Sequence, residues 1–222
     1  MKSRRLSYAV RTRTLMPVKY ANFRAFPSHN FTFQTLLKNS GVDKLASDIG
    51  DYYLDMIRDF FTTVTFGTDD FGDLVFTTKV NNVEICMDLK QLGTCLEIPS
   101  EGEEIRHGTD PDTDAWRNYN SLEYFVLISR GTQASLMSRQ KSESSRVVKF
   151  VNLLSVSDRM LHYVLAYVLV PKHSNHAQVS ELELQLIRAL KMNMKINWAY
   201  IIYHHMKHQL SLSGGLPYGR IV

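Results

Sequence analysis

Apolar side chains recur at helical spacing in the last third of the chain. The clearest stripe runs from Met160 to Leu169 and stops at Pro171, which cannot continue a helix. Ser157 or Asp158 is placed to cap the start of this helix. The pattern therefore predicts an amphipathic helix over this segment.

Two further helices are predicted downstream. Ser180 and Glu183 have the spacing of a capping box, and Asn197 stands before a third periodic segment. None of the three helices hides its apolar face alone, so we expect them to pack against one another as a C-terminal unit over residues 146–222.

The middle of the chain combines helical and strand patterns. Apolar residues at intervals of three and four predict one helix from Lys44 to Phe60, capped by Asp43. After a turn over residues 67–72, two β-rich runs flank Asn81-Asn82, a pair that favours a tight hairpin.

A short helix should follow the hairpin, capped by Asp88 and ended by Pro99. The run from Trp116 to Ile128 is continuously apolar, so it is compatible with either a helix or a strand. We expect residues 31–128 to form a helix/hairpin/helix subdomain.

These elements predict a mainly α protein of the α+β class, a helical bundle with one small β-hairpin. Residues 1–30 lack periodicity and contain Pro17 and Pro27, so they are interpreted as a basic, flexible arm. Residues 129–145 are rich in serine and are the best candidate for a linker. The 44% of hydrophobic residues and 22% of charged residues exclude a wholly disordered or fibrous chain.

Charge is distributed unevenly. The first 24 residues have no acid and seven cations, which are candidates for nonspecific contact with nucleic acid: Lys2, Arg4, Arg5, Arg11, Arg13, Lys19 and Arg24. A stretch of acids lies between Glu97 and Asp114. This pattern suits contact of the arm with a polyanion or docking of the acidic stretch on a basic surface of the same protein.

Nothing in the sequence indicates a cofactor, a metal or a membrane segment. Cys86 and Cys95 lack metal-ligand spacing and are interpreted as reduced, partly buried thiols. The longest apolar run, residues 160–170, is too short to cross a bilayer. Basic character favours a nuclear location, and an arginine-rich start without acids is also typical of organellar transit peptides.

Four constellations resemble sites, and each has a simpler interpretation. Asp69-Asp70 lacks the spacing of a polymerase metal pair and fits a surface turn. Asp110, Asp112 and Asp114 lack the glycine of a calcium loop. The third constellation is a group of histidines, His204, His205 and His208, which we expect on an exposed polar face of one helix. The fourth is a possible helix-turn-helix formed by helices 180–193 and 197–209, in which core packing of Trp198 is favoured over base recognition.

A series of short motifs in the second half, with two upstream, follows a recognisable order: Asp59-Phe60-Phe61, Leu96-Glu97-Ile98-Pro99, Arg159-Met160-Leu161-His162-Tyr163, Leu169-Val170-Pro171-Lys172 with His173 and His176, Val179-Ser180, Ile196-Asn197-Trp198, His205-Met206 and Leu216-Pro217-Tyr218-Gly219. This succession resembles the plant transposon protein domain, found in plant proteins related to retrotransposons. The family has no established activity, so the resemblance implies ancestry and no catalytic residue. The stop just after Tyr218-Gly219 would fit a truncated or degenerate element copy.

The sequence therefore favours a noncatalytic, transposon-derived interaction domain that contacts nucleic acid or a protein partner. One alternative is a capsid-like structural domain that self-assembles. Another is a remnant of a metal-dependent nucleic-acid enzyme.

Overall fold

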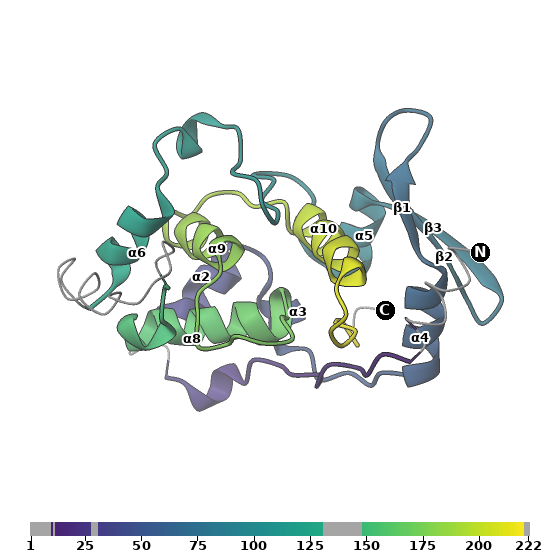
Figure 1. The fold of residues 1–222 in the computed structure, drawn as a ribbon, viewed down its shortest axis with the longest axis horizontal. Coiled ribbons are helices and arrows are strands. Elements are labelled where there is room, and N and C mark those ends of the chain that lie inside the picture. The colour runs from purple at the N-terminus through teal and green to yellow at the C-terminus, as the bar shows by residue number, and fades with distance from the viewer. Residues whose placement is uncertain (1–9, 11, 28–30, 131–147, 220–222) are drawn as a thin grey trace.

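The computed structural model describes residues 10, 12–27, 31–130 and 148–219. Its helices and one three-stranded antiparallel sheet confirm the α+β class. The molecule is elongated, with the sheet at one end and the α8–α9 helices at the other (Figure 1). Within the described residues, no helix is both long and apolar enough to cross a membrane.

The sheet has the order β1-β2-β3, with β1 at Thr65–Thr68, β2 at Leu74–Val80 and β3 at Val83–Asp88. The predicted hairpin is confirmed: Asn81 and Asn82 both have positive φ, 47° and 69°, and join β2 to β3. The sequence missed β1, which begins just before the predicted 67–72 turn. One face of the sheet packs on helix α4 through Phe76 and Val80.

The single helix predicted from Lys44 to Phe60 is wrong. The structure has α3 at Asp43–Ser47 and α4 at Leu54–Thr63, with a non-helical segment between them. Asp43 is the first residue of α3 and not its cap. At the break, a carboxylate oxygen of Asp48 accepts the backbone N–H of Gly50 at 3.0 Å, a local bond that competes with the helix at a residue of low helix propensity.

The next two helices are capped by polar side chains. In α5 (Leu89–Leu96), Asp88 and Gln91 form a capping box, so the predicted cap is confirmed. The ambiguous 116–128 run begins at the last residue of the short helix η2 (Asp114–Trp116) and contains α6 (Ser121–Ile128), whose cap Asn120 accepts two backbone N–H groups.

The C-terminal helices begin close to the predicted positions. Helix α8 (Val156–Val164) is capped by Ser155, not by Ser157 or Asp158, and it continues as a π-helical turn η4 (Leu165–Leu169) before Pro171. Helix α9 (Glu181–Lys191) has the predicted Ser180/Glu183 capping box. Helix α10 (Trp198–Ser211) is capped by Asn197 as predicted.

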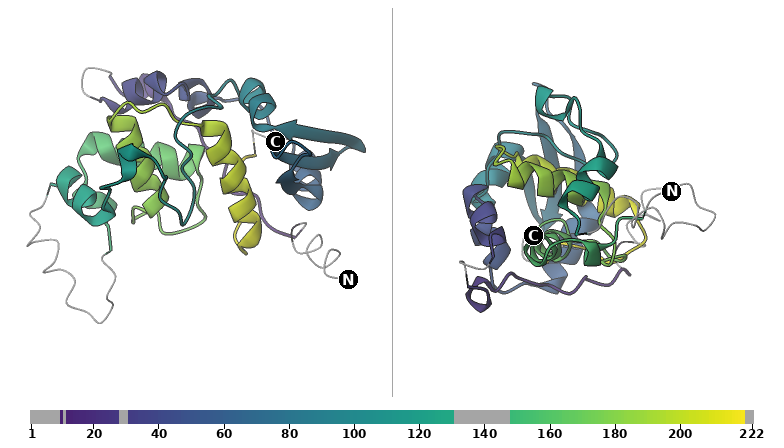
Figure 2. Two further views of the ribbon diagram at one scale, coloured as in Figure 1. Left: turned by 90° about the horizontal axis from the view of Figure 1, so that it is seen from above. Right: turned by 90° about the vertical axis from the view of Figure 1, so that its left-hand side faces the viewer.

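Helix α10 lies between the sheet, with α4 and α5 beside it, and the α8–α9 helices, and it packs mainly on α5 (Figures 1 and 2). Helix α2 (Phe33–Asn39) packs on α8 and α9. The buried apolar residues form one cluster that draws on both predicted units, 31–128 and 146–222. The two parts of the chain therefore share a core. Most of the predicted linker, residues 131–145, lies outside the described residues.

The described part of the predicted flexible arm lies along the body of the protein, and this corrects the expectation for residues 12–27. The Met16 N–H donates to the Leu216 carbonyl at 2.8 Å, and the Leu216 N–H donates to the Thr14 carbonyl at 2.8 Å. Further on, the Ala21 N–H donates to the Ala46 carbonyl at 2.7 Å. Met16 and Ala21 are buried, and the short helices η1 (Phe23–Ala25) and η3 (Val151–Leu153) complete the described elements.

The acidic stretch docks on other parts of the same chain, which was one of the two alternatives that its charge left open. Lys195 Nζ lies 2.7 Å from Glu101, and Gln185 donates to Asp110 at 2.6 Å. Arg188 of α9 lies 5.6 Å or less from the centres of three rings in this region and donates to the Ala115 carbonyl at 3.1 Å; the rings belong to Trp116, Tyr119 and Tyr124.

Candidate functional site

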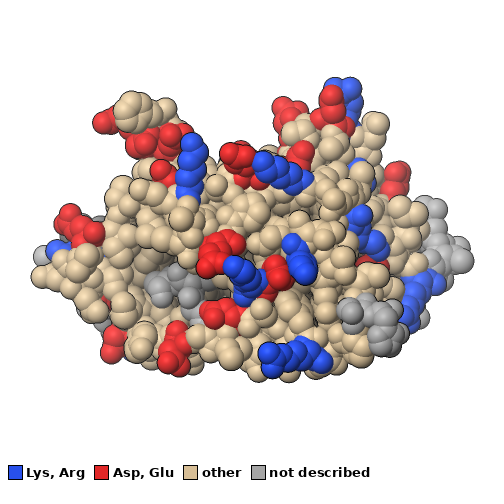
Figure 3. Space-filling model, turned by 180° about the vertical axis from the view of Figure 1, so that it is seen from behind, with Lys and Arg blue, Asp and Glu red and all other residues tan. Residues whose placement is uncertain are grey.

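The structure separates the seven cations proposed for nucleic-acid contact. Lys2, Arg4, Arg5 and Arg11 lie outside the described residues. Arg24 is exposed on η1, and the exposed Lys19 places its ammonium 4.3 Å from the centre of the Tyr167 ring. Figure 3 shows acidic and basic side chains lying next to each other on one face of the molecule, without a continuous positive surface.

Arg13 does not face outward. Its guanidinium donates to carbonyl groups at the end of α10 and just beyond it, to Gln209 at 3.0 Å, to Gly215 at 3.4 Å and also to Gly214. Backbone carbonyls at a helix C-terminus lack intrahelical partners and attract cations. Arg13 therefore has a structural role, and its contact with nucleic acid stays a prediction.

The acidic constellations do not converge on a site. One carboxylate oxygen of Asp69 accepts the backbone N–H groups of Phe71 and Asp73, both at 2.9 Å, which makes the pair with Asp70 part of a surface turn. Asp114 pairs with Arg117 at 2.5 Å. Across the described ranges, no group of three or more histidine, cysteine, aspartate or glutamate side chains is placed to hold a metal ion.

The two cysteines and the helix-turn-helix candidate have different outcomes. Cys86 and Cys95 are free, but both are exposed, so the expectation of partial burial is wrong.

Trp198 is fully buried and donates to Ser40 Oγ at 2.7 Å, which confirms core packing at the start of α10.

The three histidines of α10 do not form an exposed polar face. His205 is buried, and its ring centre lies 5.5 Å from that of His107, while the rings of His107 and His208 stack at 4.2 Å. His204 lies against Tyr200, with ring centres 4.2 Å apart. The sequence could not indicate this cluster because His107 comes from a loop far away along the chain.

A directed chain of hydrogen bonds fixes the protonation of His205. Gln209 donates its amide to Nε2 at 3.3 Å, so the proton lies on Nδ1, which donates to the Tyr218 hydroxyl oxygen at 2.7 Å. The Tyr218 hydroxyl in turn donates to the Leu169 carbonyl at 3.0 Å. Burial, with His107 and His208 alongside, lowers the pKa of His205 well below its ordinary value.

A second buried network surrounds Glu183, which is 1% exposed. Its carboxylate accepts the Ser180 N–H at 2.7 Å, lies 2.8 Å from the Lys172 ammonium, and contacts His162 Nε2 at 3.2 Å. Burial raises the pKa of Glu183, but the hydrogen bond and charge of His162, together with Lys172, outweigh it and lower the pKa to about 2. The network joins the Pro171–Ser180 loop to α9.

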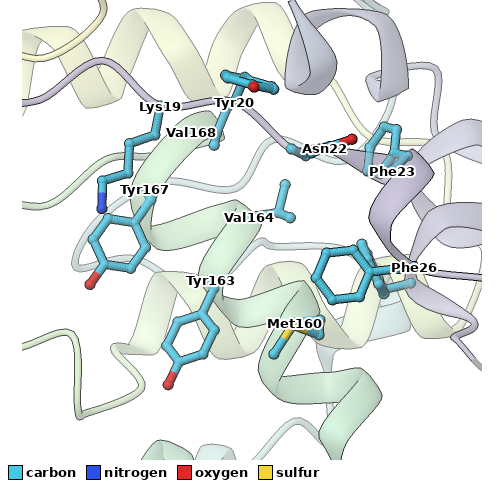
Figure 4. Close-up of a pocket in the computed structure, with 12 residues that line it drawn as sticks. Lys19, Tyr20, Asn22, Phe23, Phe26, Met160, Tyr163, Val164, Tyr167 and Val168 are labelled. Atoms are coloured by element: carbon cyan, nitrogen blue, oxygen red, sulfur yellow. The ribbon is translucent and has the colours of Figure 1, made fainter.

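A groove lined mainly by apolar side chains lies between residues 19–26 and the α8–η4 helix, with a cavity of about 190 Å³. Figure 4 shows Val164 pointing into its centre, with Phe26 and Tyr163 on either side. The only charged side chain among its lining residues is that of Lys19. The lining residues are Lys19, Tyr20, Ala21, Asn22, Phe23, Phe26, Phe33, Met160, Tyr163, Val164, Tyr167 and Val168.

One wall of this groove, which we call the Val164 groove, is stiffened by stacked rings. Tyr167 stacks on His176 with ring centres 4.1 Å apart and planes only 1° from parallel, and Lys19 covers part of its ring. A second hollow of about 260 Å³ lies beside Tyr167, lined partly by Pro171 and His173. The Val164 groove can take an apolar group and place an anion near Lys19.

The groove escaped sequence reasoning because it is formed by segments about 140 residues apart, and only the helical wall has a periodic pattern. The aromatic spacing of Phe23, Phe26 and Phe33 was the one available signal.

Comparison with models of protein families, with curated proteins and with solved structures found no match.

Proposed function

We propose that this chain is a noncatalytic interaction domain whose Val164 groove receives an apolar side chain of a partner protein. The observation that supports the proposal is the groove itself: a cavity of about 190 Å³ lined by aromatic and aliphatic side chains, with Lys19 at its rim. Tyr163, on one side of it, is 37% exposed. Apolar pockets with few polar groups are the usual binding sites of proteins.

The charge of the rim favours an acidic partner segment. Lys19 lines the groove, and the exposed Arg24 follows Phe23, another lining residue. None of the described residues that line the cavity is an aspartate or a glutamate. An apolar anchor flanked by carboxylates would therefore place its side chain in the groove and its charges near these cations.

Fluorescence polarisation with labelled acidic peptides, each with a single Phe, Leu or Trp, tests this proposal. We expect saturable binding that Val164→Phe abolishes, because the added ring fills the groove. Lys19→Glu should weaken binding, whereas Lys90→Glu, an equal charge change at an exposed residue of α5, should leave it unchanged. Absence of saturable binding by every peptide would contradict the proposal.

Nonspecific nucleic-acid contact by the arm is a second candidate, supported by the acid-free sequence of residues 1–24. Truncation is a poor test because it would remove Met16 and Ala21 from the core. Replacing Lys2, Arg4, Arg5 and Arg11 by glutamine tests it better. We expect a shallower salt dependence, by roughly 0.9 in the log–log slope for each phosphate of duplex DNA that the arm no longer neutralises. An unchanged slope would contradict this candidate.

The ancestry indicated by the resemblance is part of the proposal. Residues that carry the resemblance to the plant transposon protein domain include His162, Lys172, His205 and Tyr218, all members of the two internal networks. A common origin therefore predicts that members of that family share these internal hydrogen bonds, which a structure of one of them would test. Nuclear location is a further prediction, which microscopy of a tagged chain would check.

A further inference from the structure

The loop between β1 and β2 presents an apolar side chain to solvent. Phe71 at its tip is 92% exposed. The loop is nevertheless ordered by hydrogen bonds, because Asp69 Oδ1 accepts two backbone N–H groups and the Asp69 N–H donates to the Asp73 carbonyl at 2.9 Å. Phe71 is therefore held outward on a defined turn, where a partner can bury it.

The charge around Phe71 is opposite to that around the Val164 groove. Asp69, Asp70 and Asp73 lie in the same loop as Phe71 and are exposed, and residues 69–73 contain no lysine or arginine. At the groove, Lys19 and the neighbouring Arg24 supply cations, and no acid is found among the lining residues that the structure describes. Complementary charges of this kind orient a docking surface and favour encounter.

The size of the groove also matches a phenyl ring. An apolar cavity of roughly 150 Å³ is large enough to bind benzene, and the Val164 groove offers about 190 Å³. Its aromatic walls can contact an inserted ring edge to face, the geometry that Phe26 already has with Phe33, with ring centres 5.7 Å apart and planes at 78°.

The two features lie toward opposite ends of the long axis, the β1–β2 loop at the sheet end and the groove at the α8 end (Figures 1 and 2). Phe71 therefore cannot reach the groove of its own copy. A contact between two different surfaces of identical chains is heterologous, and any assembly that does not close into a ring keeps one free loop and one free groove at its ends.

We propose that Phe71 of one copy inserts into the Val164 groove of a second copy, so that the chain associates head to tail. This inference rests on the proposed function of the groove and names its partner. Because the contact is small, association is weak and requires high protein concentration. Because it does not close on itself at two copies, assemblies grow past the dimer as concentration rises.

Sedimentation velocity of the full chain, at concentrations up to about 1 mM, tests the proposal. We expect wild-type protein to pass from monomer to species larger than a dimer. Phe71→Ser should remain monomeric, whereas Leu127→Ser, which removes an apolar side chain that is 78% exposed on α6, should associate like wild type. Val164→Phe should also remain monomeric, with its fold verified by circular dichroism.

A mixture of the Phe71→Ser and Val164→Phe variants distinguishes a head-to-tail contact from a symmetric contact. Phe71→Ser keeps an intact groove, and Val164→Phe keeps an intact loop. An equimolar mixture should form a heterodimer and stop there, because no further loop and groove are free. A second set of variants changes the charges at the contact and leaves the apolar floor of the groove intact. Asp70→Lys and Lys19→Glu should each weaken association, and the double variant should restore it because the two charges are exchanged.

Several outcomes overturn the inference. They are a wild-type chain that stays monomeric over the whole range, a Phe71→Ser variant that associates normally, and a mixture that forms no heterodimer. Peptide binding to the groove by a monomeric chain would preserve the proposed function and assign the groove to a different protein. If the wild-type chain neither binds the peptides nor associates, both the proposed function of the groove and the head-to-tail contact are contradicted.

Discussion

The Tyr218 hydroxyl oxygen lies 2.7 Å from Nδ1 of His205, and this hydrogen bond joins the last described segment to the middle of α10. His205 is fully buried, and the neutral ring uses both of its nitrogens. Two more imidazoles, those of His107 and His208, lie beside it. Protonation inside this cluster would place positive charges next to one another in a largely buried environment.

We therefore expect stability to fall in mild acid. Burial, and then His208, lower the pKa of His107 from 6.5 to about 4. Between these values the unfolded state binds more protons, so the free energy of unfolding is highest above about pH 6.5 and is lost as pH falls through about 4. The loss from His107 alone is roughly 3 kcal/mol.

Urea unfolding at several pH values between about 4 and 8 measures this loss. His107→Phe keeps a stacked ring that does not titrate, so this variant should show a weaker pH dependence. Glu183, whose pKa falls from 4.5 to about 2, begins to lose its own contribution only below about pH 4.5, so it adds to the loss at the acid edge of the window and His107 dominates above it. Stability that is flat from pH 8 to pH 4 would contradict the prediction.

Removing the Tyr218 hydroxyl should destabilise the protein. Tyr218→Phe leaves the His205 Nδ1–H and the Leu169 carbonyl without this partner in the interior, which costs about 1–3 kcal/mol. Tyr53→Phe, at a position that is 65% exposed, is the matched control and should change stability by less than about 0.5 kcal/mol. Denaturant midpoints compare the two, and equal effects would show that the buried chain is unimportant.

The two glutamates at the start of α9 should differ in their effect on stability. Glu183→Gln removes the buried carboxylate that pairs with Lys172, which we expect to cost about 3 kcal/mol. Glu181→Gln, at a more exposed residue paired with Lys149, should cost less than about 1 kcal/mol. Chemical denaturation of both variants gives the comparison, and a Glu183 variant as stable as the Glu181 variant would rule out the ranking.

Arg13 and Arg24 provide a test of the corrected role of the arm. Arg13→Met removes hydrogen bonds to carbonyls after α10, so we expect a loss of about 1–3 kcal/mol of stability. Arg24→Met should leave stability unchanged because Arg24 is exposed. Thermal unfolding measures both, and the opposite order would mean that the Arg13 hydrogen bonds contribute nothing.

Local signals in the sequence predicted much of the fold. Asp88, Ser180 and Asn197 have side chains that bond to backbone groups a few residues ahead, and such caps depend on short spacing alone. The Asn81-Asn82 turn succeeded for the same reason. The 44–60 helix failed because Asp48 forms a local bond that a hydrophobic pattern does not reveal.

The candidate site was less accessible to such reasoning. The Val164 groove needs residues 19–26 to lie against α8, and nothing periodic in that segment indicates where it packs. Arg13 belongs to a basic segment whose composition indicates contact with nucleic acid, but the carbonyl groups that it binds in the structure lie about 200 residues away in the sequence. Contacts between distant segments depend on the assembled core, which no short motif encodes.

The pairing of Thr14 and Met16 with Leu216 has a consequence for biosynthesis. A chain leaves the ribosome from its N-terminus, so the first segment must wait for its hydrogen-bonding partner until nearly all of the described protein has been made. Closing so long a loop is also an intrinsically slow step. During translation the apolar side chains that this pairing covers remain open to chaperones, and completion of the fold becomes a post-translational event.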